Sequence, residues 1–330
     1  MEKTMQAYVL EGSAEAPQGS VTTFETANLP EGEVTVKVEY SSVNYKDAMI
    51  NVGAGKMVRK FPHIPGIDFS GEVLSDATGG LQPGDKVTLS GHEVGLGHFG
   101  GYAQFARVPA AWVVKLPAGL STFEASALGT AGFTAMLGLM ALERNGLTPG
   151  AGPVLITGAT GGVGSTAVDL FARAGYTVAA SSGKPDMAEF LRKLGAERVL
   201  AREEVQEDSG RVLLKEEWAG GLDQVGGPTL EYLLRATRTG GSVAATGMVQ
   251  SPSFSTTVYP FILRGVNLLG VDSQHCPMEM REAAWARLGG KLKPKFLSEI
   301  AREIPLADLP GALKEILAGG ARGRYVVKMP

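Results

Sequence analysis

The feature that most constrains the fold lies at residues 154–165, which read VLITGATGGVGS. A short apolar run is followed by four glycines within seven residues and then by a helical pattern. Glycines in such a place form a tight turn, let the backbone approach a pyrophosphate and allow the helix to pack closely on the strand. The phosphates would lie at the positive N-terminus of that helix. The stretch therefore predicts a dinucleotide-binding turn.

From about residue 123 the chain alternates short apolar strands with helices, which supports this interpretation. An apolar helix is expected from Thr122, as its N-cap, to Leu142. Beyond the turn, strands are expected at residues 176–180, 198–200, 221–225 and 241–245, and helices at 163–174, 186–194 and 229–237. Such alternation predicts a parallel sheet with helices on both faces. The apolar run 131–142 is too short to cross a bilayer, which needs about 20 residues.

The first 120 residues show a different pattern of apolar, polar and turn-forming residues. Short β segments are separated by clusters of Gly, Pro and Asp, and residues 33–40 alternate apolar and polar side chains as a half-buried strand does. This part predicts a β-rich domain of partly open barrel type. After residue 270 the chain turns helical and ends in an apolar strand at 325–328, which we expect to return to this first domain.

The residues after the second strand of the alternating part indicate whether the cofactor is NAD or NADPH. An NAD site usually carries Asp or Glu about 20 residues beyond the glycines, where it accepts from the ribose hydroxyls. Here the chain offers Ser181, Ser182 and Lys184, and the first carboxylate is Asp186. Hydroxyls and a lysine suit a 2′-phosphate. Two arginines near the next strand, Arg198 and Arg202, would complete the pocket, so the prediction is NADPH.

Composition excludes several classes of protein. The 330 residues include one cysteine, which rules out a disulfide framework or a multi-cysteine zinc lobe. The formal net charge of −3 and the lack of a basic stripe argue against a nucleic-acid or anionic-membrane surface. The N-terminus lacks a signal-peptide pattern. We expect a cytoplasmic protein with no membrane partner.

Four stretches carry a family resemblance that runs along the whole chain. They are residues 41–48 (SSVNYKDA), 61–71 (FPHIPGIDFSG), 129–136 (GTAGFTAM) and 260–264 (PFILR), followed by GVDS at 270–273. The sequence resembles the medium-chain dehydrogenase/reductase superfamily in its zinc-free, quinone-oxidoreductase-like branch. Within that branch it is similar to the NADPH-dependent acrylyl-CoA reductases.

The resemblance implies an α/β protein with a GroES-like β-rich catalytic domain and a doubly wound Rossmann domain. The catalytic domain would be split into residues 1–122 and 271–330, and the NADPH-binding domain would span 123–270. Together with the turn and the strand that follows it, the resemblance implies these cofactor-binding residues: Thr130, Thr134, Thr157, Ala159, Thr160, Gly161, Gly162, Val163, Ser181, Ser182, Lys184, Arg198, Arg202, Gly247, Phe261, Ile262 and Leu263.

The zinc-dependent members of this superfamily carry Gly-His-Glu-x-x-Gly and a catalytic cysteine. Here Ile67 and Asp68 stand where the His-Glu pair would be, and Asn44 stands at the cysteine position. Without thiolate or imidazole there, a tetrahedral zinc has no ligand set, so no metal is expected. The pair His92 and Glu93 has the wrong spacing.

The loop at residues 44–47 occupies the family's catalytic region. Asn44 and Tyr45 are the candidate catalytic residues, and Tyr45 would either donate to the substrate carbonyl, deliver a proton, or only pack over the nicotinamide. Lys46 and Asp47 are expected to pair with each other. His98 is a candidate for the substrate cleft, and Arg59 for the phosphates of coenzyme A.

Three functions remain open at this point. The first is hydride transfer from NADPH to the C=C bond of a short enoyl-CoA such as acrylyl-CoA. The second is an NADPH:quinone oxidoreductase with a flat apolar acceptor. The third is a non-catalytic NADPH-binding protein of crystallin-like or nucleic-acid-binding type, which the acidic balance disfavours. The resemblance also implies a homodimer joined edge to edge through the strand near residues 266–269.

Overall fold

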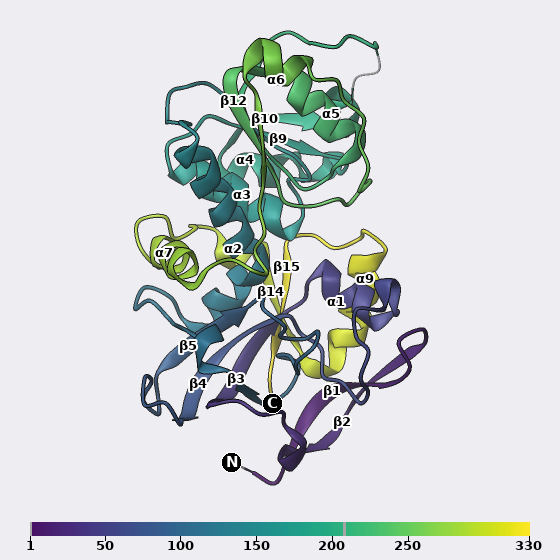
Figure 1. Cartoon of the computed structure of the whole chain (residues 1–330), viewed down its shortest axis with the longest axis vertical. Coiled ribbons are helices and arrows are strands. Elements are labelled where there is room, and N and C mark those ends of the chain that lie inside the picture. Colours follow the sequence, from purple (N-terminus) through teal and green to yellow (C-terminus); the bar gives the residue numbers. More distant parts are fainter. Residues whose placement is uncertain (1, 207–208) are drawn as a thin grey trace. The chain divides into compact units, whose positions relative to one another are not determined.

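The computed structural model describes residues 2–206 and 209–330, which form two compact units (Figure 1). Unit 1 holds residues up to Thr130 together with 273–290 and 297–330. Unit 2 holds residues 131–272 and 291–296, as far as they are described. The chain therefore leaves the first unit, builds most of the second, and returns to the first, apart from the short segment 291–296.

Unit 1 is built on a mixed sheet with the strand order β14-β15-β3-β4-β5-β7, and β6 also pairs with β3. Neighbouring strands are antiparallel, except that β14 and β15 run parallel. In β3 the valines at 34, 36 and 38 are buried while Lys37 is exposed, as the alternation in the sequence predicts. The strands are β3 (Val34–Ser42), β4 (Asp68–Asp76), β5 (Lys86–Ser90), β6 (Phe105–Val108), β7 (Val114–Lys115), β14 (Ala301–Pro305) and β15 (Arg324–Lys328).

A separate hairpin and several short helices complete unit 1. Strands β1 (Thr4–Gly12) and β2 (Pro17–Glu25) pair along their whole length. The helices are α1 (Tyr45–Asn51), α7 (Met278–Gly289), α8 (Leu297–Ile300), α9 (Leu309–Leu317) and the short 3-10 turns η1 (Thr26–Asn28), η2 (Ala54–Lys56), η3 (Ala110–Trp112) and η6 (Leu306–Asp308). The residues of β2 are nearly all exposed and show no apolar pattern, so the sequence alone does not indicate this strand.

Unit 2 contains a parallel six-stranded sheet with the order β10-β9-β8-β11-β12-β13. Its strands are β8 (Val154–Ile156), β9 (Val178–Ser182), β10 (Ala196–Ala201), β11 (Trp218–Asp223), β12 (Thr237–Ala245) and β13 (Asn267–Gly270). The helices are α3 (Gly162–Arg173), α4 (Ala188–Leu194), α5 (Gly227–Ala236) and α6 (Tyr259–Arg264), with turns η4 (Pro185–Met187) and η5 (Arg202–Val205). The strand order reverses between β8 and β11, where dinucleotides bind in doubly wound sheets.

Helix α2 (Thr122–Arg144) is the longest helix among the described residues and is largely apolar. By length and composition alone it could span a membrane, but 89% of its apolar window is buried in the protein, as in a core helix. The predicted N-cap was wrong by one residue. Ser121 exchanges hydrogen bonds with Glu124 as the cap, whereas the Thr122 hydroxyl donates to Glu39.

Candidate functional site

The glycine-rich turn joins β8 to α3 and has the geometry of a phosphate cradle. Gly158 has a φ of +56°, a left-handed conformation that favours glycine. A Cβ on Gly164 would lie 2.4 Å from the Gly158 carbonyl oxygen, so only a glycine lets α3 pack this closely on the turn. Gly161 caps the helix, and Gly162 and Val163 open it, without a side-chain hydrogen bond at the cap. The N-terminus of α3 thus presents backbone N–H groups as an anion site.

Two hydrogen bonds fix the turn to the end of β9. The N–H of Ala159 donates to the Ser181 carbonyl at 2.9 Å, and the hydroxyls of Thr160 and Ser182 lie 3.1 Å apart. The Ser182 hydroxyl also accepts from the N–H of Lys184 at 3.0 Å. The predicted turn residues and the predicted adenosine-side residues therefore lie together in unit 2.

The structure separates the two arginines that sequence analysis grouped. Arg202 lies against the backbone after β9, because a Cβ on Gly183 would be 2.5 Å from its guanidinium. Arg198 pairs with Glu217 at 2.8 Å and lies over the ring of Trp218. Arg202 is thus placed beside Ser182 and Lys184, while the charge of Arg198 is already compensated by a carboxylate.

A second polar group lies at the carboxyl end of β11. The Thr157 hydroxyl donates to Asp223 at 2.7 Å, and Asp223 also accepts from the N–H of Gly226. Burial raises the pKa of Asp223. Thr157 therefore ties β8 to β11, a structural bond that sequence analysis did not foresee. Gly247 is required by close packing, since a Cβ there would lie 2.7 Å from the Gln224 carbonyl oxygen.

The other predicted cofactor residues lie on two helices. Phe261 is partly buried against the core of unit 2, whereas Ile262 and Leu263 of α6 are exposed. Thr134 is buried in α2, and Thr130 lies four residues before it, at the end of unit 1.

In unit 1 a buried polar cluster surrounds Asn44, the residue that caps α1. Asn44 and Asp47 form a capping box, in which the Asp47 carboxylate accepts from the backbone N–H and the side-chain amide of Asn44. The Asn44 amide also donates to Asp68 at 2.9 Å and accepts from Arg324 at 3.0 Å. Both polar atoms of the Asn44 side chain are thus engaged within the protein.

Two carboxylates and one guanidinium share this cluster. Asp68 accepts from the backbone N–H and the hydroxyl of Ser42, and Arg324 donates to the same hydroxyl. Burial, and next the charge of Asp68, raise the pKa of Asp47 to about 7. Burial lowers the pKa of Arg324 although both carboxylates oppose this shift. Sequence analysis missed Arg324, because its partners are about 200 to 280 positions earlier in the chain.

Helix α2 breaks beside this cluster. Gly129 has φ +47° and ψ −151°, which is not helical, and the helix continues on either side. The backbone N–H of Thr130 donates to Asp68 at 2.8 Å, and Arg324 donates to the Ala127 carbonyl at 3.2 Å. The cluster thus satisfies backbone groups at the kink.

Tyr45, the first residue of α1, is 47% exposed. The expectation that Lys46 and Asp47 pair with each other is wrong. Lys46 donates to Gln274 at 2.8 Å, and Asp47 accepts from the N–H of Ile67 and from Asn44. Asp47 faces inward because its carboxylate accepts hydrogen bonds from Asn44, in the capping box of α1, and from the N–H of Ile67.

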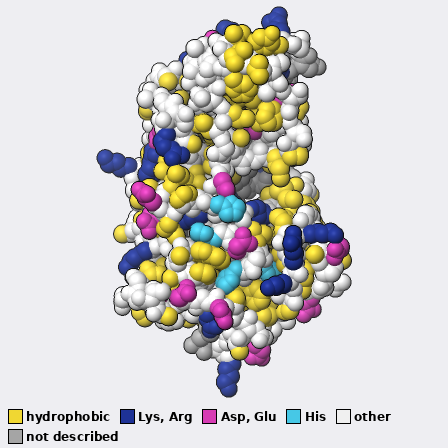
Figure 2. Space-filling model, in the orientation of Figure 1, with side chains coloured by type: hydrophobic (Ala, Val, Ile, Leu, Met, Phe, Trp, Pro, Cys, Tyr) yellow, Lys and Arg dark blue, Asp and Glu magenta, His cyan; other side chains and the backbone are white. Residues whose placement is uncertain are grey.

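The histidines gather on one face of unit 1, as Figure 2 shows in cyan. The His92 ring stacks on Trp112, and the His98 ring meets the same indole edge-on. His98 Nε2 is 2.8 Å from the Arg107 carbonyl, so its ring is held by the backbone. Burial lowers the pKa of His63 and of His92 to about 4. Arg59 is exposed on its loop.

The donor set around Asp68 does not fit a zinc ion. The groups present are carboxylates, an amide and a hydroxyl, whereas structural and catalytic zinc sites are built mainly on thiolate and imidazole. The guanidinium of Arg324 already supplies the positive charge. Within residues 2–206 and 209–330, no three His, Cys, Asp or Glu side chains are grouped as a metal site would need.

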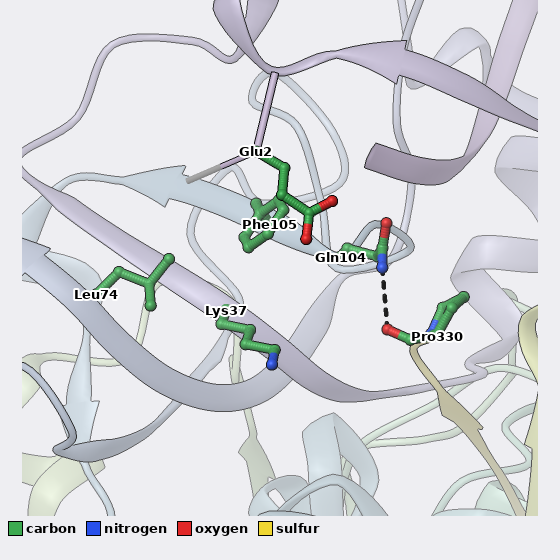
Figure 3. A pocket seen from close by; sticks show the side chains of 6 residues that line it. All are labelled: Glu2, Lys37, Leu74, Gln104, Phe105 and Pro330. Atoms are coloured by element: carbon green, nitrogen blue, oxygen red, sulfur yellow. Dashed lines mark hydrogen bonds between the residues drawn. The ribbon is translucent and has the colours of Figure 1, made fainter. Parts of the chain in front are cut away.

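A pocket of about 450 Å³ lies elsewhere in unit 1 and is shown in Figure 3. The amide of Gln104 donates to the Pro330 carbonyl at its edge. The lining residues are Glu2, Lys37, Leu74, Gln104, Phe105 and Pro330. None of the predicted site residues is among them, and we assign this pocket no role.

Two family models match this chain. The alcohol dehydrogenase GroES-like domain matches residues 30–118, and the zinc-binding dehydrogenase model matches residues 162–288. The chain is 51% identical over 310 residues to acrylyl-CoA reductase AcuI of Ruegeria pomeroyi, covering 94% of each chain. It is 44% identical over 330 residues to the putative quinone oxidoreductase YhfP of Bacillus subtilis, covering all of both.

Solved structures similar to this chain carry bound dinucleotides. The yhdH oxidoreductase from Salmonella enterica in complex with NADP is 48% identical, with a TM-score of 0.95, covering 99% of this chain and 100% of the other. Bacillus subtilis yhfP with NAD bound is 45% identical, with a TM-score of 0.96 and the same coverage. Both kinds of nicotinamide dinucleotide thus occur among the similar structures.

Proposed function

Because this chain belongs to the medium-chain dehydrogenase/reductase superfamily, as its motifs predict, we propose that it is an NADPH-dependent reductase of short enoyl-CoA esters. Its substrate class would be that of acrylyl-CoA. The observation that carries this proposal is the 51% identity to an acrylyl-CoA reductase over 94% of both chains. The phosphate cradle of unit 2 and the polar cluster of unit 1 supply the binding and positioning groups that such chemistry needs.

The residues of unit 2 fit NADPH. The cradle before α3 needs glycine at 158 and 164, which leaves bare backbone for a pyrophosphate. Beyond β9, Ser182 and Lys184 adjoin Arg202, and these groups favour a 2′-phosphate over a bare ribose. One similar structure holds NAD, so the preference for NADPH over NADH is to be tested by comparing the Kd values of the two cofactors.

When bound, NADPH supplies a hydride. An enoyl thioester would accept that hydride at Cβ, negative charge would develop on the thioester oxygen, and Cα would take a proton. Stabilisation of such an oxygen requires a hydrogen-bond donor aimed at it. The hydroxyl of Tyr45, a residue that is 47% exposed, is our candidate for that donor or for the source of the proton.

We assign Asn44 a positioning role. Asn44 is 8% exposed and its amide is bonded to Asp47, Asp68 and Arg324, so it has no free donor for a substrate. As the N-cap of α1 it fixes the backbone that carries Tyr45. Arg59, exposed on its loop, remains our candidate for a coenzyme A phosphate, and His98 for the edge of the substrate site.

Quinone reduction is the second candidate, favoured by the 44% identity to a putative quinone oxidoreductase over the whole of both chains. The test follows NADPH oxidation with acrylyl-CoA, crotonyl-CoA and a quinone in parallel. Turnover with the CoA esters and little with the quinone is expected. Turnover with the quinone alone would overturn the first proposal in favour of the second.

We also propose a homodimer, joined through strand β13. This strand is at the edge of the six-stranded sheet and leaves one side unpaired within the described chain. Exposed apolar side chains lie on α6 nearby, including Tyr259, Ile262 and Leu263, and Figure 2 shows hydrophobic side chains gathered where Figure 1 draws this helix. Sedimentation of the purified protein should give twice the chain mass, and Leu269→Arg should give a monomer. A monomeric wild-type protein would contradict the proposal.

A cytoplasmic location belongs to the same proposal. It is supported by the sequence, which holds one cysteine and therefore has no disulfide within the chain. Fractionation of cells that express the chain should recover it with the soluble cytoplasmic enzymes.

A further inference from the structure

Gln224, the residue after β11, carries a buried acceptor that nothing in the described chain satisfies. Its side chain is 7% exposed, and its Oε1 has no hydrogen-bond partner among residues 2–206 and 209–330. A buried amide oxygen without a partner destabilises the fold, because it has lost its hydrogen bonds to water and gained none. Such an atom in a folded protein calls for an explanation, and a ligand is one.

The identity of this atom follows from its surroundings. Nε2 of Gln224 lies 3.1 Å from the Leu222 carbonyl oxygen, which can only accept a hydrogen bond. The amide nitrogen must therefore point to Leu222, and the amide oxygen must be the atom without a partner. The backbone is fixed as well, because the N–H of Gln224 donates to the Thr157 hydroxyl and its carbonyl accepts from Val249.

The free oxygen lies beside the glycine-rich turn. A Cβ built on Gly158 would be 3.6 Å from Oε1 of Gln224. This places the oxygen at the carboxyl end of β11, at the point where the strand order reverses between β8 and β11. Ser182 and Lys184 lie beyond β9, on the other side of β8, where the adenosine half is expected. Gln224 is therefore on the side expected for the nicotinamide half.

An amide oxygen selects a hydrogen-bond donor. The phosphates of a dinucleotide are acceptors at neutral pH and cannot satisfy it, whereas the ribose hydroxyls and the carboxamide of the nicotinamide half can donate. We propose that Gln224 binds the nicotinamide nucleoside of the cofactor by accepting a hydrogen bond from one of these donors. This inference rests on the proposed use of NADPH.

The test compares two ligands by calorimetry, without substrate. NADPH carries the nicotinamide nucleoside, and adenosine 2′,5′-bisphosphate lacks it. Gln224→Met keeps the volume and removes the acceptor, so its Kd for NADPH should rise about 3- to 10-fold. Its Kd for the bisphosphate should stay that of the wild type. Gln224→Leu serves as the second variant if the first does not fold.

The matched control is Gln250→Met, because Gln250 is exposed and its amide oxygen is bonded to Gln206. It should leave both constants unchanged. An unchanged Kd of Gln224→Met for NADPH would overturn the inference, because the amide oxygen of Gln224 would then accept its hydrogen bond from water and not from the cofactor. An equal loss for both ligands would also overturn it and would indicate a damaged turn. Failure of the wild-type protein to bind NADPH would instead reject the proposed cofactor.

Discussion

Asp68 and Arg324 together satisfy the backbone of α2 where it breaks at Gly129. The Asp68 carboxylate accepts from the N–H of Thr130 after the break, and the Arg324 guanidinium donates to the carbonyl of Ala127 before it. Both side chains are almost wholly buried, at 1% and 4% exposed. The two charged side chains, whose burial is costly, thus provide hydrogen bonds to backbone groups that the break in α2 leaves without a helical partner.

Gly129→Ala should destabilise the fold severely. The residue has a positive φ, and an added Cβ would lie 2.5 Å from the Ser42 hydroxyl and 2.6 Å from Arg324. We expect a loss of about 3 kcal/mol or more in the free energy of unfolding, measured in urea. Gly146→Ala is the control, because Gly146 has a φ of +89° and open space around it. It should cost about 1 kcal/mol. Equal losses would show that steric contact at Gly129 is unimportant.

Arg324→Lys tests the fork geometry of the guanidinium. Arg324 donates to Ala127, Asn44 and Ser42 from its three nitrogens, and one ammonium cannot reach all three directions. With at least two bonds lost, the free energy of unfolding should fall by about 2 kcal/mol. The control Arg302→Lys is at an exposed position of β14 and should change stability by less than about 0.5 kcal/mol. A stable Arg324→Lys protein would refute the role of the fork.

Local patterns were sufficient to predict most of unit 2. The turn at 154–165 and the alternation after it predict β8, α3, β9 and the strands that follow, since each is coded by adjacent residues. Strand β14 was missed, because its residues 301–305 hold two charged side chains and a proline and are ordered by pairing with β15. Such pairing comes from parts of the chain that no short window contains.

The candidate site was predicted unevenly for the same reason. Asn44 and Tyr45 were found through a resemblance, but the partners of Asn44 come from β4 and β15 and cannot be seen in the loop itself. Arg198 and Arg202 look equivalent in sequence. Only the fold shows that Glu217 and Trp218 engage the first.

Asp47→Asn should change how stability depends on pH. Burial raises the pKa of Asp47 to about 7 in the folded protein, while the unfolded value is near 3.8. Between these values the folded state keeps a proton that the unfolded state releases, so rising pH favours unfolding. The contribution of this group should fall by about 3 kcal/mol from pH 4 to pH 7, with a slope that approaches 1.4 kcal/mol per unit in the middle of the range.

The readout is therefore the wild-type minus variant difference in unfolding free energy, measured across that range. The difference is needed because His63 acts in the opposite direction. Its lowered pKa makes stability fall as pH drops from about 6.5 toward 4. The control Glu31→Gln is exposed and should show no such trend. A pH-independent difference for Asp47→Asn would mean that Asp47 is charged in the fold.

Arg202→Ala should weaken NADPH binding and leave NADH binding alone. Arg202 lies against Gly183 beside the proposed 2′-phosphate site, and a charged hydrogen bond to a phosphate is worth about 1.5 kcal/mol or more. The Kd for NADPH should rise about 10-fold, as measured by calorimetry. Arg198→Ala is the matched control, because Arg198 is paired with Glu217, and it should bind both cofactors normally. A larger loss in the Arg198 variant would reverse the assignment.

Tyr45→Phe tests the proposed donor in the reaction. Tyr45 is an exposed residue at the start of α1, so loss of its hydroxyl should leave the fold intact. If it donates to the developing oxyanion or supplies the proton, kcat with acrylyl-CoA should fall at least about 100-fold while KM changes little. The control Tyr259→Phe removes a similarly exposed hydroxyl on α6 and should keep full turnover. If the Tyr45 variant turned over at the wild-type rate, Tyr45 would at most pack against its ligands, and the proton would have to come from another group or from water.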